Sequence, residues 1–181
     1  MRDVLEAFDR FLGQRKPPFE GIVIGGAALI LLGIIQRDTM DVDILDPALP
    51  EDLRDAAVRF AKRYRGAPLP LKEDWLNNGP MSLRKDLPEG WRERTAPLFD
   101  GKNLRLRTLG RSDLLRAKLF AYCDRQEDFL DCVAMAPTKK ELQELLPWLQ
   151  ERDANELWPE HVRRSLKALA EKLGHAIDAG R

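Results

Sequence analysis

Residues 23–45 read VIGGAALILLGIIQRDTMDVDIL, and this stretch decides the fold class. It begins as a short apolar strand, turns at Gly25-Gly26, continues as an almost wholly apolar helix and returns in a second strand, MDVDIL. Alternation of strand and helix over such short distances is typical of a mixed α/β domain. Asp41 and Asp43 lie two residues apart on the second strand, so we expect both carboxylates on one face.

Two carboxylates this close repel each other unless a cation lies between them or both point into water. Proteins bind Mg²⁺ through one or two carboxylates together with substrate phosphates, and glycines allow a backbone to approach phosphate oxygens closely. Asp41 and Asp43 are therefore a candidate metal site, and Gly25 and Gly26 a candidate phosphate contact. The alternatives are a solvent-facing edge strand and a plain turn.

The composition is that of a globular protein. Of 181 residues, 44% are hydrophobic, and 30 basic residues balance 30 acidic ones. Such a chain can bury a substantial core, and its zero net charge gives no overall attraction to nucleic acid or to an anionic membrane. The apolar run 22–35 is shorter than the roughly 20 residues that span a bilayer, and the N-terminus does not resemble a signal peptide. We expect a cytoplasmic protein without a membrane segment, whose Cys123 and Cys132 stay reduced.

Other elements follow from local patterns. Apolar residues at helical spacing predict helices near 4–12 and 50–64, whereas the proline-rich segment 66–101 predicts loops with one or two short strands. The sequence NLRLRTL, at 103–109, alternates as a strand with leucines on one face and arginines on the other. Beyond it only helices are expected, one of them opened by a capping box at 138–141.

Two motifs carry a family resemblance. The order of strand, Gly-Gly turn, apolar helix and R-x-T-x-D-x-D resembles the nucleotidyltransferase fold of the DNA polymerase β superfamily. The sequence DLLRAKLFAYCDRQEDFLDCVAM, at 113–135, resembles helices of the AbiEii-type toxin nucleotidyltransferases. The resemblance implies a minimal nucleotidyltransferase fold of class α/β (α+β), with a small mixed sheet flanked by helices over residues 1–136. Residues 137–181 are expected to be helices packed on the same domain.

The same resemblance implies roles for single residues. Asp41 and Asp43 would bind Mg²⁺ and serve catalysis, and Lys118 with Asp128 or Asp131 would complete the catalytic site. The residues implied in nucleotide binding are Gly25, Gly26, Arg37, Thr39 and Lys118. Each has a structural alternative: Lys118 as a lysine that reaches the surface along its apolar stem, the two helical aspartates as a surface ion-pair face, and Arg37 as the partner of a surface carboxylate.

A third carboxylate is missing from the expected place. Many members of the superfamily carry one on a later strand, where this chain has Arg105 and Arg107. Either Asp128 or Asp131 replaces it from a helix, with Asp100 a poorer candidate, or the protein binds nucleotide without transferring it.

The expected reaction is Mg²⁺-dependent transfer of a nucleoside monophosphate from a nucleoside triphosphate to an acceptor hydroxyl. By resemblance the acceptor is an RNA end, a protein side chain or a small molecule, and the protein is toxin-like with an antitoxin partner. The alternative is a catalytically silent nucleotide-binding or toxin–antitoxin module of the same fold. A local basic set favours a polyanion: Arg84, Lys85, Arg92, Arg94, Arg105, Arg107 and Arg111.

Overall fold

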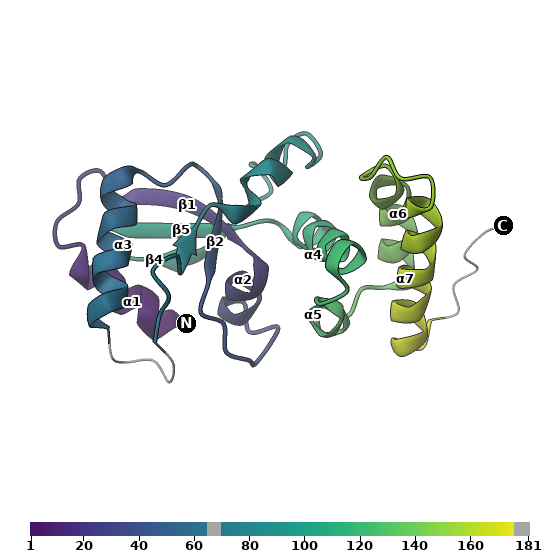
Figure 1. The fold of residues 1–181 in the computed structure, drawn as a ribbon, viewed down its shortest axis with the longest axis horizontal. Helices are drawn as coiled ribbons and strands as arrows, with labels where there is room; N and C mark the ends of the chain where they lie inside the picture. Colours follow the sequence, from purple (N-terminus) through teal and green to yellow (C-terminus); the bar gives the residue numbers. More distant parts are fainter. Residues whose placement is uncertain (65–69, 176–181) are drawn as a thin grey trace. The chain divides into compact units, whose positions relative to one another are not determined.

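The structure is a computed structural model that describes residues 1–64 and 70–175 (Figure 1). The chain divides into two compact units, Met1–Gly110 and Arg111–Arg181. The first unit contains the sheet, and the described part of the second contains helices. The expected grouping of residues 1–136 with helices 137–181 on one domain stays a prediction.

The first unit is built on a five-stranded mixed sheet in the order β3-β2-β1-β5-β4. The strands are β1 (Phe19–Ile24), β2 (Val42–Asp46), β3 (Leu76–Asn77), β4 (Ala96–Asp100) and β5 (Leu104–Thr108). Strand β1 pairs antiparallel with β2 and parallel with β5, while β2 and β3 run parallel. The mixed sheet flanked by helices confirms the expected α/β class.

Four helical elements accompany the sheet: α1 (Arg2–Phe11), α2 (Gly25–Leu31), α3 (Glu51–Arg63) and the 3₁₀ helix η1 (Gly79–Lys85). Helices α1 and α3 lie side by side (Figure 1) because each has an apolar stripe. Between them Phe8, Phe60 and Trp75 form an aromatic cluster, with Phe8 at 5.1 Å from Trp75 and 5.2 Å from Phe60 between ring centroids. The Trp75 indole donates to the carbonyl of Ala57, which satisfies its N–H in the core.

Strand β5 shows the predicted alternation. Its leucines Leu104 and Leu106 are buried, whereas Arg105 and Arg107 are exposed. The segment 66–101, where one or two short strands were expected, contains β3 and β4. The local sequence pattern is therefore sufficient to assign both faces of β5.

The second unit consists of α4 (Arg111–Arg125), α5 (Phe129–Ala134), α6 (Lys139–Gln150) and α7 (Trp158–Lys172). The predicted capping box is present: the Glu141 N–H donates to Thr138 Oγ1 at 3.1 Å and the Thr138 N–H donates to the Glu141 carboxylate at 2.8 Å. Both cysteines are free thiols, and burial raises the pKa of Cys123 and of Cys132 to about 12. Over the described part of the chain, no helix has the length and apolar character needed to cross a membrane.

Candidate nucleotide and metal site

The turn after β1 brings Gly25 against a carboxylate. Helix α2 begins directly at Gly25, whose φ of +75° is in the left-handed region that favours glycine. A Cβ built on Gly25 would lie 2.6 Å from Asp43 Oδ2, far inside van der Waals contact. The backbone and the carboxylate can approach this closely only because residue 25 has no side chain.

Gly26 lies against the loop that leads into β2. A Cβ on Gly26 would lie 3.2 Å from the Arg37 guanidinium and 3.4 Å from Thr39 Oγ1. Residues that the sequence placed in one motif, although 11 to 13 positions apart, are thus neighbours in space. The turn is surrounded by a hydroxyl, a guanidinium and a carboxylate, which are groups suited to bind a phosphate together with its metal.

Asp41 and Asp43 lie at the end of the sheet where strand β1 finishes. Asp43 is within β2, Asp41 directly precedes the strand, and both are half-buried. Both Asp43 and Arg107 pair with residues of β1. Asp43 pairs with Ile24, and Arg107 pairs with Ile22, two residues earlier on the same strand. Paired residues on neighbouring strands point to the same face of a sheet, and residues two apart on one strand also share a face. Asp43 therefore points to the same face as Arg107, opposite to the buried leucines of β5.

Asn77 was not anticipated from the sequence. Its Nδ2 donates to Asp43 Oδ1 at 3.1 Å, and its Oδ1 accepts the Gly79 N–H at 2.7 Å. A backbone N–H can only donate, so Gly79 fixes the orientation of the amide and directs its NH₂ group to Asp43. Asn77 thereby holds one carboxylate oxygen and leaves the other beside Gly25.

The residues present fit Mg²⁺ that arrives with a nucleotide. Within residues 1–64 and 70–175, no group of three or more His, Cys, Asp or Glu side chains could hold a metal ion. Mg²⁺ needs fewer protein ligands, because it keeps waters and binds substrate phosphates. The Asp43 carboxylate beside the Gly25 turn, with Asp41 two residues before it in the chain, therefore meets this requirement, whereas the described residues contain no all-protein metal cage.

The helical unit brings Lys118, Asp128 and Asp131 together. The Lys118 ammonium donates to Asp128 at 2.6 Å and to Asp131 at 2.7 Å, and only 5% of the lysine is exposed. Burial raises the pKa of Asp128, but the hydrogen bonds from Lys118 and Arg125 outweigh it, so that this pKa lies below its usual value. The lysine is therefore not a surface residue, and the two aspartates are not a surface face. The expected approach of Lys118 to Asp43 joins two different units and stays a prediction.

The basic set is largely engaged in internal contacts. Arg84 and Arg92 donate to Asp46 at 2.7 and 3.2 Å, and the Arg107 guanidinium donates to the hydroxyl and the carbonyl of Thr95. Although burial alone raises the pKa of Asp46, the two guanidiniums lower it overall. Trp91 is buried under the Arg92 guanidinium, which lies 4.3 Å from the ring centroid. Arg84 and Arg92 thus hold the segment after β3 against β2, whereas Arg107 holds Thr95 against β5.

A mixed sheet with a glycine turn against a strand carboxylate is the arrangement expected of a nucleotidyltransferase-like protein. Residues 1–145 match the family DUF6036, described as a nucleotidyltransferase of unknown function. The chain belongs to this family. Comparison with curated proteins and with solved structures gave no match.

Proposed function

We propose that this protein is a Mg²⁺-dependent nucleotidyltransferase that moves a nucleoside monophosphate from a nucleoside triphosphate to an acceptor hydroxyl. The observation that carries the proposal is the close approach of Asp43 to Gly25, where a built Cβ would lie 2.6 Å from Asp43 Oδ2. The turn would bind phosphate there and the carboxylate would bind the metal. The family description supports the reaction class.

In this reaction the acceptor oxygen forms a bond to the α-phosphorus, and the bond from that phosphorus to the bridging oxygen breaks. Pyrophosphate leaves with the electron pair, and the hydroxyl proton passes to water. Asp41 and Asp43 would hold Mg²⁺, which supplies neutralisation of the developing charge. The Gly25-Gly26 backbone would admit the phosphates, and the neighbouring Arg37 would donate to their oxygens.

The motif at residues 113–135 contributes a separate set of residues to the proposal. Lys118, Asp128 and Asp131 would act in the same reaction, with the two carboxylates orienting the lysine. A toxin-like role with an antitoxin partner and a cytoplasmic location complete the proposal. Growth arrest on induction of the wild-type chain, absent for Asp43→Asn, would support the toxin-like role.

The test is calorimetric titration of each nucleoside triphosphate with Mg²⁺ into the wild type, Asp41→Asn and Asp43→Asn. Loss of a metal ligand should weaken binding by about 100-fold or more, since removal of groups that merely orient ligands already costs about 10- to 100-fold. Asp38→Asn is the matched control, because it removes an exposed carboxylate from the same loop. Unchanged affinity in both metal-site variants would refute the metal assignment.

A second function, nucleotide binding without transfer, is favoured by one observation. The described residues offer no third carboxylate beside Asp41 and Asp43. Incubation with labelled nucleoside triphosphates and cellular RNA, protein and metabolite fractions separates the two functions. Label on any fraction that requires Asp43 supports the transferase, whereas tight binding without label supports the silent module.

A further inference from the structure

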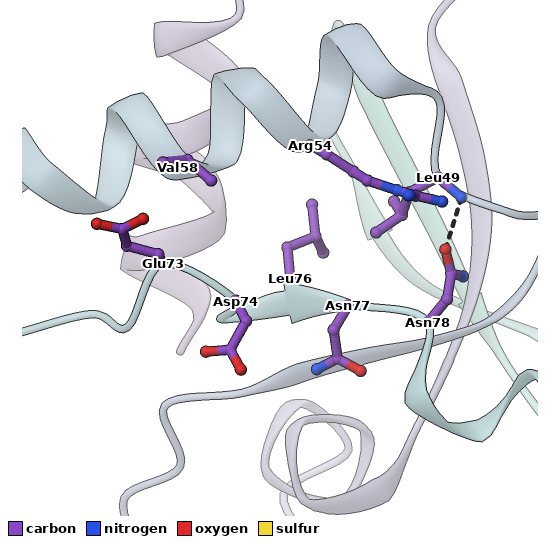
Figure 2. A pocket seen from close by; sticks show the side chains of 8 residues that line it. All are labelled: Leu49, Arg54, Val58, Glu73, Asp74, Leu76, Asn77 and Asn78. Carbon is purple, nitrogen blue, oxygen red and sulfur yellow. Dashed lines mark hydrogen bonds between the residues drawn. The ribbon is translucent and has the colours of Figure 1, made fainter.

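The two faces of the sheet differ beside β3. A pocket of about 440 Å³ lies on the α3 side, where Leu76 points, whereas the Asn77 side chain points away from α3 (Figure 2). Asn77 donates to Asp43, so the proposed metal-binding carboxylate also lies on the face turned away from α3. An acceptor that reaches Asp43 is therefore bound on this second face, which we call the Asp43 face, and not in the pocket.

We propose that the Asp43 face binds the acceptor, and that the acceptor is a small hydroxyl compound with one phosphate group; this inference rests on the proposed function. The hydroxyl would lie at Asp43 and its metal, and the phosphate would be bound by Arg92 and Arg107. The hydroxyl oxygen forms the bond to the α-phosphorus of the nucleotide, and the acceptor keeps its own phosphate.

The register of the strands supports this placement. Ile22 of β1 pairs with Asp46 of β2 on one side and with Arg107 of β5 on the other. Asp43 pairs with Ile24, two residues further along β1, which corresponds to about 6.6 Å. Since paired residues share a face, as do residues two apart on one strand, Asp43, Asp46 and Arg107 lie on one surface. A small molecule can therefore reach from the metal site to the arginines.

A chain of hydrogen bonds connects the guanidinium groups across β1. Arg84 and Arg92 donate to Asp46 at 2.7 and 3.2 Å. The hydroxyl of Thr95 donates to the Arg92 carbonyl at 2.8 Å and accepts from Arg107 Nε at 2.8 Å. No described residue accepts a hydrogen bond from the terminal NH₂ groups of Arg92 or from Nη1 of Arg107. These donors can bind an anion, and guanidinium groups suit the oxygens of a phosphate.

Both guanidinium groups are held in place although they are exposed. Arg92 lies over the Trp91 ring, 4.3 Å from its centroid, and 55% of its side chain is exposed. Arg107 also donates to the Thr95 carbonyl at 2.6 Å. An exposed arginine that is already fixed loses little side-chain freedom when it binds a ligand, which favours affinity.

The direction of the reaction favours the same surface. The proposed phosphate-binding turn, Gly25-Gly26, follows the end of β1, whereas Ile22 lies before that end, and Asp43 lies between them. In phosphoryl transfer the attacking and leaving oxygens lie roughly in line on opposite sides of the phosphorus. With the leaving pyrophosphate toward the turn, the acceptor approaches from the side of Ile22, where the arginines lie.

Charges further along the Asp43 face limit the acceptor to one phosphate group. Arg105 pairs with Glu20 on one side and with Asp100 on the other. Its guanidinium lies 3.5 Å from each of these two exposed carboxylates. One guanidinium thus faces two carboxylates, so this end of the face would repel a continuing phosphate backbone. A small phosphorylated molecule fits the pattern better than a nucleic acid does.

The probe is glycerol phosphate, titrated by calorimetry into protein saturated with Mg²⁺ and a non-hydrolysable nucleoside triphosphate, so that the nucleotide site is already filled. Glycerol lacks the anion, and methyl phosphate lacks the hydroxyl. We expect glycerol phosphate to bind and each partial compound to bind about 10-fold more weakly or less, because each loses a hydrogen bond to a charged partner.

Variants locate the phosphate. Arg92→Gln and Arg107→Gln should each weaken glycerol phosphate binding by about 10-fold, because a charge-assisted hydrogen bond is lost. Arg107→Lys keeps the charge and should bind more tightly than Arg107→Gln, which a purely structural role would not require. Arg105→Gln is the matched control, because it removes an exposed arginine from the same face of β5 and should leave binding unchanged.

Four outcomes overturn the inference: no binding of glycerol phosphate, equal binding of methyl phosphate, equal losses in Arg105→Gln and Arg107→Gln, or tighter Arg107-dependent binding of a short oligoribonucleotide. Titration of Mg²⁺-nucleotide into Asp43→Asn reports separately on the proposed function. If nucleotide binding depends on Asp43 while glycerol phosphate does not bind, the proposed function stands with another acceptor. If nucleotide binding does not depend on Asp43, the proposed function itself has failed.

Discussion

Two pairs of aspartates in this chain differ in burial. Asp128 and Asp131 are buried and both accept hydrogen bonds from the Lys118 ammonium. Asp41 and Asp43 are half-buried at the end of the sheet where β1 finishes, and Asp43 accepts a hydrogen bond from the Asn77 amide. A buried carboxylate pair needs a permanent internal cation, because desolvation of unpaired charge is costly. A half-buried pair can accept its cation from outside. Residue type alone thus does not distinguish a pair that supports the fold from one suited to bind a metal.

The largest effect that tests this contrast is expected from Lys118→Met. It removes the ammonium to which both buried carboxylates are bonded, while Asp128 keeps its bond to Arg125, and it should lower the free energy of unfolding by about 3–5 kcal/mol. Urea denaturation followed by circular dichroism measures this. The control is Lys140→Met, which removes an exposed lysine paired with Glu144 and should cost less than about 0.5 kcal/mol. Equal stabilities of the two variants would show that the buried cluster does not support the fold.

A second contrast is between Gly25 and Gly33, which have φ angles of +75° and +73°. Alanine at either position should cost about 1–2 kcal/mol through left-handed strain. Only at Gly25 does the new Cβ meet Asp43 Oδ2, whereas no atom outside its chain neighbours lies within 4 Å of a Cβ at Gly33. We expect Gly25→Ala to abolish Mg²⁺-nucleotide binding and Gly33→Ala to retain it, measured by calorimetry. Equal nucleotide binding by the two variants would show that the Gly25 turn is not part of the nucleotide site.

The parts of the fold that were predictable depend on local patterns. The alternation of Leu104 to Arg107 assigned β5 and its faces, and the spacing of Thr138 and Glu141 assigned a helix start. These signals are contained within a few residues, because the physics that generates them is the pleat of a strand or the first turn of a helix.

The contact between Asn77 and Asp43 could not be predicted in this way. Strand β3 has only two residues, too few to show a period, and its partner in the sheet is 34 positions away. Likewise, the burial of Lys118 depends on a chain reversal at Gln126, whose φ of +61° has no clear signal in the sequence. The motif residues of the candidate site were identifiable from resemblance, but their orienting partners required tertiary structure.

A smaller effect is expected on the pH dependence of stability. The folded-state pKa of Asp128 lies below its usual value of about 4, so its stabilising contribution is complete above that pH and is lost as the pH falls through the lowered pKa. Asp128→Asn should therefore be less stable than the wild type at pH 7, and the difference should narrow below about pH 4. Urea midpoints between pH 7 and pH 3 measure it. Asp124→Asn, which removes an exposed carboxylate nearby, should parallel the wild type.

The smallest effect is expected from Asn77→Ala, which removes the amide that donates to Asp43. Two hydrogen bonds are lost, but the partners stay accessible to water, so stability should fall by only about 1 kcal/mol. The carboxylate is then less well oriented, and the Mg²⁺ concentration for half-maximal nucleotide binding should rise by about 10-fold. A purely structural role for Asn77 would lower stability without this shift. Asn78→Ala is the matched control, because it removes the adjacent amide, which bonds to Leu49 and Ile44 rather than to Asp43. If both alanine variants shift the Mg²⁺ requirement equally, the orienting role of Asn77 is refuted and the effect belongs to the segment as a whole.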